Sequence, residues 1–240
     1  MRNFKKMLPQ RMRHEHKYIS PEYILSALQM RIATIMQADS HAGSAGFYEI
    51  RSVYFDDIYD TCFFENEDGT DPREKFRIRI YNCSKERISL ELKQKQNGFG
   101  KKLLCPISLE ICEQILRGEI PDFSNETPPL LKKLICQMHF RALRPVVIVA
   151  YERFPFVWEA GNVRVTFDKN VRSSNCIESF FERDIPFRPI FPRDTNMLEV
   201  KFDELLPDFI NEILQTGFLR QTAFSKYYMC RKFQLGGMCA

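Results

Sequence analysis

Several segments of the chain place charged residues at every second position, between residues that are mostly hydrophobic. Because a strand sends alternate side chains to opposite faces, each segment is predicted to form a strand with one apolar and one charged face. Most of the charges on these faces are positive. The segments are residues 13–17, 75–79, 91–95, 151–153, 164–168 and 199–201.

The wider pattern predicts mostly strands, with helices singly between them. Longer alternating stretches predict strands at 47–57, 73–82, 87–96, 101–105, 145–156, 162–169 and 197–202. Apolar residues at helical spacing predict helices at 21–36, 108–117, 129–140, 207–215 and 224–233. Residues 39–46 and 63–68 are interpreted as loops. This order of elements predicts an α+β fold.

The charged strand faces allow two arrangements. In an ordinary antiparallel sheet the charged face meets water. In a closed barrel it lines the interior, and helices cover the apolar outer face. Solvated faces usually mix in serine and threonine, whereas arginine and glutamate recur here with little dilution. The pattern alone leaves both arrangements open.

Composition narrows the class of protein. A chain of 240 residues fits a single domain over 1–240 and can bury a substantial core. Hydrophobic residues make up 44% and charged residues 28%, which is typical of a globular protein. A net charge of +4 from 35 basic and 31 acidic residues predicts no nucleic-acid partner. A cationic site must therefore come from the way the basic residues are arranged in the fold, and not from an excess of them in the composition.

The sequence contains no recognisable signal for export, for a membrane span or for a zinc site, and we therefore expect a cytoplasmic protein. The longest apolar run, residues 145–150, is too short to span a bilayer, and no secretory signal is expected. The eight cysteines form no C-x-x-C pair and are predicted to be reduced thiols. The four histidines do not complete a zinc-binding pattern, so His14 and His16 are expected to have packing or surface roles. Residues 98–102 do not form a Walker A phosphate loop.

The charged faces themselves suggest two kinds of chemistry. Arg77 and Arg79 share one face, and their guanidinium groups suit phosphate oxygens. Lys93 and Lys95 follow on the next predicted strand. Clustered cations oppose folding unless acidic neighbours or a ligand neutralise them. Nearby glutamates could form a salt-bridge ladder with these cations, or hold Mg²⁺ or Mn²⁺ against a phosphate.

The first charged strand resembles a known motif. Arg13-x-Glu15-x-Lys17-Tyr18 is similar to the E-x-E-x-K strand of the triphosphate tunnel metalloenzymes, also called the CYTH superfamily. Arg13 replaces the first acid, as in the VTC (vacuolar transporter chaperone) polyphosphate polymerase branch. Further segments resemble motifs of that branch in the same order, across residues 11–233. They are residues 52–57, 75–81, 90–95, 151–153, 164–168, 198–201 and 224–227.

The resemblance implies an antiparallel β-barrel of about eight strands, a triphosphate tunnel, with helices packed outside. It also implies Mn²⁺ or Mg²⁺ as cofactor. The residues that it assigns to catalysis are Arg77, Arg79, Lys93, Arg153 and Lys201. Those that it assigns to phosphate binding are Arg13, Lys17, Lys95, Tyr151, Ser225 and Lys226. Glu199 is the best metal ligand, and Glu15 and Glu91 are weaker candidates.

Three functions remain as hypotheses. The first is a metal-dependent polyphosphate polymerase that transfers the γ-phosphate of ATP to a growing polyphosphate chain. The second is a hydrolase of inorganic or nucleoside triphosphates in the same tunnel, and the third is a non-catalytic polyphosphate-binding module. The expected partners are ATP, polyphosphate or triphosphate. The expected location is the cytoplasm, with a separate membrane protein left open as a partner at the inner face of the membrane.

Overall fold

A ten-stranded antiparallel sheet dominates the computed structural model, which describes residues 14–97, 99–215, 217 and 219–236. Its main path runs in the order β1-β10-β8-β7-β3-β4-β5-β6. The strands of this path are β1 (His14–Pro21), β3 (Tyr48–Asp56), β4 (Arg73–Tyr81), β5 (Ser89–Gln96), β6 (Phe99–Pro106), β7 (Arg144–Trp158), β8 (Val163–Ser174) and β10 (Thr195–Phe202). The short strands β2 (Gln37–Ala38) and β9 (Arg188–Pro189) pair with β7 and β8.

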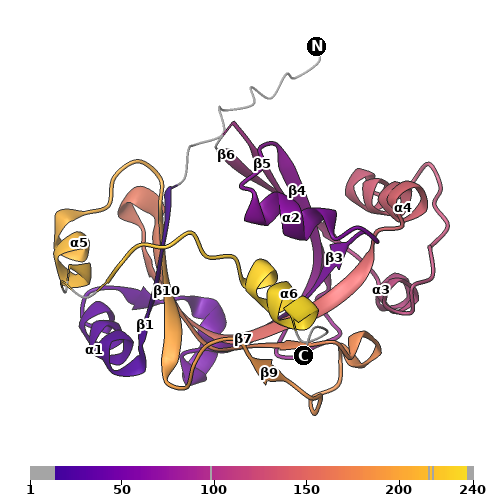
Figure 1. Cartoon of the computed structure of the whole chain (residues 1–240). Coiled ribbons are helices and arrows are strands. Elements are labelled where there is room, and N and C mark those ends of the chain that lie inside the picture. Colours follow the sequence, from indigo (N-terminus) through magenta and orange to yellow (C-terminus); the bar gives the residue numbers. More distant parts are fainter. Residues whose placement is uncertain (1–13, 98, 216, 218, 237–240) are drawn as a thin grey trace.

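The sheet curls into a half-barrel with a concave inner face (Figure 1). β1 and β6 are the two ends of the strand order, and within the described residues they share no backbone hydrogen bond. The predicted antiparallel α+β barrel is therefore confirmed in the form of a curled, laterally open sheet.

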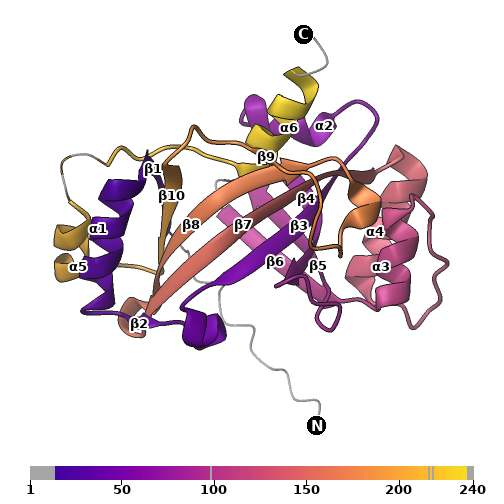
Figure 2. The same cartoon turned by 90° about the horizontal axis from the view of Figure 1, so that it is seen from below.

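The helices are α1 (Glu22–Ala33), α2 (Thr61–Glu67), α3 (Leu109–Leu116), α4 (Pro129–Arg141), α5 (Asp208–Leu214) and α6 (Lys226–Gly236). Two pairs of them cover the outer face of the sheet, α1 with α5 at one end and α3 with α4 at the other (Figure 2). The helix predictions are thus confirmed to within a few residues at each end.

The outer face supplies most of the hydrophobic core. Val165 and Leu198 point outward and are completely buried against α1 and α5, while Ile78 is buried beneath α3 and α4. Each such side chain contributes about 1.5–3 kcal/mol relative to an exposed one. The alternation that buries them turns the polar residues between them toward the inner face. The helices thereby fix which face of every strand is charged.

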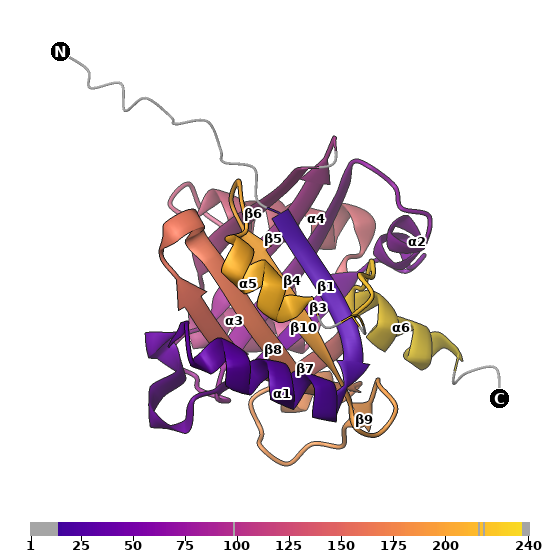
Figure 3. The ribbon, with the colours of Figure 1, turned by 90° about the vertical axis from the view of Figure 1, so that its left-hand side faces the viewer.

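Unlike the four helices of the outer face, α6 packs on inward-facing side chains. The Tyr227 ring lies against Tyr54 of β3, with 5.3 Å between centroids. The Tyr227 hydroxyl donates a hydrogen bond to Asp56 at the end of β3. Seen with β1 in front, α6 lies to one side of the strands, next to α2 (Figure 3). It therefore closes part of the concave face.

The interpretation of residues 63–68 as a loop was wrong, because residues 61–67 form α2. The carboxylate of Asp56 accepts hydrogen bonds from the backbone N–H groups of Cys62 (2.8 Å) and Phe63 (3.1 Å) at the start of this helix. Phe63 is buried and stacks on Tyr228 of α6. The helix depends on these long-range contacts, which local sequence patterns do not reveal.

Two smaller expectations are confirmed. The rings of His14 and His16 pack on Phe202, at 5.0 and 5.2 Å between centroids. Every cysteine within the described ranges is a free thiol. In the part of the chain that the structure describes, none of the helices has the length and apolarity needed to cross a bilayer.

Asp56 is predicted to be a stability determinant. Replacing Asp56 with alanine leaves buried N–H groups at the start of α2 without an acceptor and removes the partner of Tyr227. We expect the free energy of unfolding, measured with urea, to fall by about 3 kcal/mol. Asp68→Ala, an exposed control at the end of α2, should change it by less than about 0.5 kcal/mol. Equal effects of the two substitutions would contradict this role of Asp56.

Candidate functional site

The register of the sheet brings opposite charges together on the inner face. Lys17 lies opposite Glu199, and Glu15 lies opposite Lys201, between β1 and β10. Across other strand pairs, Arg153 lies opposite Asp168 and Arg77 lies opposite Glu91. These partners are distant in sequence, so the pairing of the strands, and not local sequence, creates the site.

One cluster of buried charges centres on Asp168 in β8. Arg153 donates two hydrogen bonds to its carboxylate, from Nε to Oδ1 at 2.7 Å and from Nη2 to Oδ2 at 2.8 Å. The ammonium group of Lys226, at the start of α6, lies 2.6 Å from Oδ2. Burial alone would raise the pKa of Asp168, but Arg153 and Lys226 hold it below its ordinary value. Asp168 thus fixes both cations toward the inner face.

Glu199 extends this cluster to β10. Its carboxylate accepts a hydrogen bond from Arg153 Nη2 at 3.1 Å and lies 2.9 Å from Lys201 Nζ. Burial alone would raise the pKa of Glu199, but Lys201, a hydrogen bond with Glu15, and nearby Lys226 and Arg153 hold it well below the ordinary value. Glu199 is therefore ionised throughout the physiological pH range.

A second cluster lies on β3, β4, β5 and β6. Arg77 donates from Nε to Glu91 Oε2 at 2.7 Å and from Nη1 to the Tyr54 hydroxyl at 2.8 Å. Lys102 Nζ lies 2.9 Å from Glu91 Oε1. Although burial alone would raise the pKa of Glu91, Arg77, Arg79 and Lys102 lower it to about 2. Both oxygens of Glu91 are thus occupied by cations.

Arg79 is a buried cation with neutral partners. Its Nε donates to Ser52 Oγ at 3.1 Å and its Nη2 donates to the Tyr151 hydroxyl at 3.3 Å. Among the described residues, no carboxylate forms an ion pair with Arg79. A guanidinium group cannot lose its charge in a protein. Its positive charge is therefore available to an anion on the inner face.

Lys75 is a second basic residue on the inner face that has no carboxylate partner among the described residues. Its Nζ donates to Asn66 Oδ1 at 2.5 Å and to Ser225 Oγ at 3.4 Å. Burial, with the nearby charges of Arg73 and Lys93, lowers the pKa of Lys75 from 10.5 to about 7. The low pKa reflects the absence of a carboxylate partner among the described residues.

The structure brings most of the predicted site residues onto one face. Tyr151, Ser225 and Lys226 lie at the enclosed end, near α6, whereas Lys93 is largely exposed on β5. Lys17 donates to the Phe224 carbonyl and pairs with Glu15 at 3.4 Å. Lys95 lies opposite Arg73, and Arg13 lies outside the described residues.

The sequence reasoning missed other members of the site. Asp168 and Tyr54 stand in segments recognised by motif, and Lys75 precedes Arg77 by two residues on the same strand face. The motif segments and the strand alternation could therefore have identified these three residues from the sequence. Lys102 joins the site only because β6 pairs with β5.

The donor set fits a divalent cation at Glu15 and Glu199. Lys201 Nζ lies 3.5 Å from the carboxylate of Glu15 and 2.9 Å from that of Glu199, so the two glutamates are neighbours. Two carboxylates completed by phosphate oxygens suit Mg²⁺ or Mn²⁺. Glu91 does not join them, and the described residues contain no cluster of three or more acidic, histidine or cysteine ligands. Of the three predicted ligands, Glu15 and Glu199 are the two that lie next to each other.

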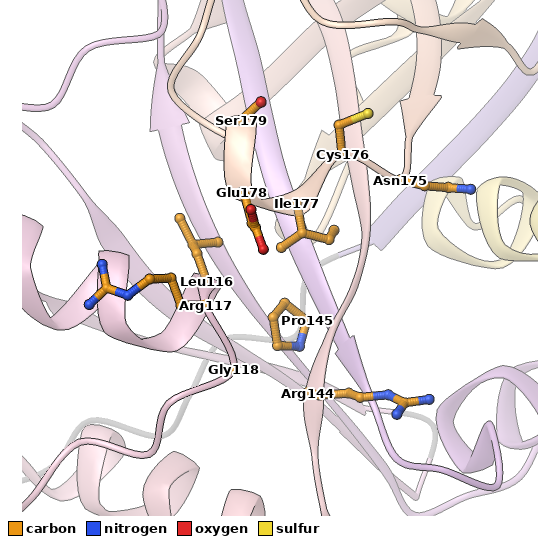
Figure 4. A pocket seen from close by; sticks show the side chains of 10 residues that line it. All are labelled: Leu116, Arg117, Gly118, Arg144, Pro145, Asn175, Cys176, Ile177, Glu178 and Ser179. Atoms are coloured by element: carbon orange, nitrogen blue, oxygen red, sulfur yellow. The ribbon is translucent and has the colours of Figure 1, made fainter.

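A cavity of about 420 Å³ lies elsewhere, between the end of α3, the start of β7 and residues 175–179 (Figure 4). No predicted site residue lines it. Two arginines line it, Arg117 and Arg144, and Arg117 is paired with the exposed Glu119 at 2.7 Å. The concave face of the sheet is therefore the better candidate for an anionic substrate.

A curled antiparallel sheet with buried cations and carboxylates on its inner face defines the architecture of a triphosphate tunnel protein. The family model of the VTC domain matches residues 12–234. The chain therefore belongs to the VTC domain family, as its motifs predicted. No match was found among curated proteins.

Three solved structures are similar to this chain at low sequence identity. A Bacillus halodurans protein, provisionally assigned as an adenylate cyclase, has a TM-score of 0.51 and 17% identity, over 90% of this chain and 94% of that one. A Pyrococcus horikoshii protein has a TM-score of 0.47 and 14% identity, over 93% and 99% of the two chains. A mimivirus capping enzyme triphosphatase has a TM-score of 0.43 and 8% identity, over 89% and 91%. Of the three, the Bacillus halodurans structure supports the assignment of the fold, and it supports nothing further about function.

The charge of Lys75 should make stability depend on pH. Below its pKa of about 7, Lys75 is charged in both folded and unfolded protein, and the fold bears the full cost of burial. Between that pKa and 10.5 only the unfolded state is charged, so wild-type stability rises with pH. We expect Lys75→Met to be more stable than the wild type at pH 6 by at least about 2 kcal/mol in urea unfolding, and the gain to shrink by pH 9.

The matched control for this substitution is Lys101→Met, which removes an exposed lysine on β6. Its effect should stay below about 0.5 kcal/mol at both pH values. A Lys75→Met protein that is less stable than the wild type at pH 6 would show that the buried ammonium group has a stabilising partner.

Proposed function

We propose that this protein is a metal-dependent polyphosphate polymerase, which transfers the γ-phosphate of ATP to the end of a polyphosphate chain. The observation that carries the proposal is the excess of basic side chains on the inner face, above all the buried and permanently charged Arg79 and the half-buried Lys75, whose pKa of about 7 leaves it partly protonated at neutral pH. Both lack a carboxylate partner among the described residues. A chain of phosphates supplies repeated negative charge for such a surface. Membership of the VTC domain family supports this choice of anion.

The reaction needs positioning and charge stabilisation more than acid–base chemistry. An oxygen of the terminal phosphate of the chain attacks the γ-phosphorus of ATP in line with the bond to the β–γ bridging oxygen. That bond breaks, ADP leaves, and the chain is one phosphate longer. The attacking oxygen is already ionised, so no general base is required. As negative charge develops on the transferred group in the transition state, that group interacts more strongly with the fixed cations. This stronger interaction lowers the activation barrier of the transfer.

The predicted catalytic and phosphate-binding residues form two groups in this account. Those proposed to contact the transferred phosphate are Arg77, Arg79, Lys93, Arg153 and Lys201, all on strands that face the concave side. Those proposed to hold neighbouring phosphates are Lys17, Lys95, Tyr151, Ser225 and Lys226, with Arg13 outside the described residues. Asp168 positions Arg153 and Lys226 through the contacts at 2.7 and 2.6 Å.

Glu15 and Glu199 would hold Mn²⁺ or Mg²⁺. A bound divalent ion neutralises charge on phosphate oxygens and adds to the effect of the basic side chains. The low pKa of Glu199 keeps it deprotonated, which is the form in which a carboxylate binds a metal ion, and the ion would take the place of Arg153 and Lys201 on its oxygens.

The test is to incubate purified protein with ATP and Mn²⁺ and to follow phosphorus NMR and ADP release. We expect one ADP for each phosphate added, and the growth of the internal-phosphate resonance of polyphosphate. A chelator should stop the reaction. Inorganic phosphate as the only product would overturn the proposal in favour of a hydrolase. Tight binding of polyphosphate without turnover would overturn it in favour of a non-catalytic binding module.

A further inference from the structure

A row of lysines crosses three strands of the inner face toward the free edge of the sheet. Lys75 lies opposite Lys93, and Lys93 lies opposite Lys102, across β4, β5 and β6. Adjacent strands are about 4.8 Å apart, and like charges directly opposite each other destabilise a sheet. The neighbouring pair, Arg73 and Lys95, is also of like charge. Folding alone does not favour this arrangement.

Each lysine of the row reaches away from the other two. Lys75 donates to Asn66 and Ser225, and Lys102 lies 2.9 Å from Glu91. Lys93 has its contact with Glu15 at 3.4 Å. The side chains of Lys93 and Lys102 are 55% and 43% exposed. At β5 and β6 the row is therefore accessible from solvent, while at β4 it joins the buried site.

The row ends where the half-barrel is open. β6 and β1 share no backbone hydrogen bond in the described part of the chain. Across the opening, an ion pair between Lys93 and Glu15 links β5 to β1. An exposed pair of this kind contributes less than about 1 kcal/mol. Breaking the ion pair between Lys93 and Glu15 therefore costs little free energy, so a polyanion can replace Glu15 as the partner of Lys93.

We propose that the row formed by Lys75, Lys93 and Lys102 binds a segment of polyphosphate and leads it sideways out of the half-barrel, between β1 and β6. This inference rests on the proposed function for the identity of the polyanion. A polyphosphate chain carries a negative charge on every internal phosphate, which matches a repeating row of cations. Internal segments can enter such an opening without a free end.

Side entry distinguishes this path from threading along the axis of the sheet. A threaded chain must present one end to the opening, whereas a chain that enters between β1 and β6 need not. A short ligand such as tripolyphosphate fills the buried site and gains little from Lys102 at the edge. The length of the ligand and the state of its ends are therefore the variables to test.

The first test compares two variants on the same strand. We expect Lys102→Gln to weaken the binding of long-chain polyphosphate about tenfold in calorimetric titrations, and to weaken that of tripolyphosphate less. Lys101→Gln is the matched control, because Lys101 lies on the opposite face of β6, and it should change either affinity less than about twofold. Equal losses for both ligands in Lys102→Gln, or equal effects of the two variants, would overturn the side path.

The second test uses the unaltered protein and long-chain polyphosphate with streptavidin attached at both ends. Side entry predicts that this chain binds within about threefold of the affinity of the free chain. Binding of the free chain alone would refute side entry and leave the proposed function standing. If neither chain binds and tripolyphosphate also fails to bind, the proposed function fails together with the inference.

Discussion

The incomplete neutralisation of buried positive charge is the constraint that shapes this protein. Arg153 and Lys226 are stabilised by Asp168, at 2.7 and 2.6 Å, but Arg79 contacts only hydroxyl groups among the described residues. Burying a charge without an ionic partner costs stability. The apolar outer face, covered by α1, α5, α3 and α4, offsets that cost. The fold thereby holds a surface with incompletely neutralised positive charge, which the proposed function assigns to an anionic substrate.

The inner face is not uniform from one side to the other. At β7, β8, β10 and α6 the charges are buried and paired, as for Glu199 with Arg153 and Lys201. At β5 and β6 the lysines are exposed, and Lys93 is only weakly paired with Glu15, whereas Lys102 pairs with Glu91. The enclosed side suits a reaction that requires fixed charges and exclusion of water, although Lys93, which is proposed to contact the transferred phosphate, lies on the open side. The open side suits reversible contact with a long, flexible polyanion.

Much of this arrangement could be predicted from the alternation of residues along single strands. Alternation placed Arg77 with Arg79 on one face, and the order of motifs identified that face as the inner one. The pairing of Glu91 with Lys102 could not be predicted, because it depends on where β6 aligns with β5. The helix α2 could not be predicted either, since its first N–H groups are capped by Asp56 from a preceding strand. The lateral opening depends on the curvature of the whole sheet, which no local pattern specifies.

The division between cations that complete the fold and cations that await an anion is the central claim. Arg79→Met tests it most directly, compared with Arg87→Met at an exposed position before β5. Tripolyphosphate should bind Arg79→Met roughly 10–100-fold more weakly than the wild type in calorimetric titrations, because a charge-assisted contact of about 1.5–3 kcal/mol is lost. The urea stability of Arg79→Met should be unchanged or higher, and Arg87→Met should behave as the wild type. Unaltered tripolyphosphate affinity in Arg79→Met, or its unfolding, would contradict the account.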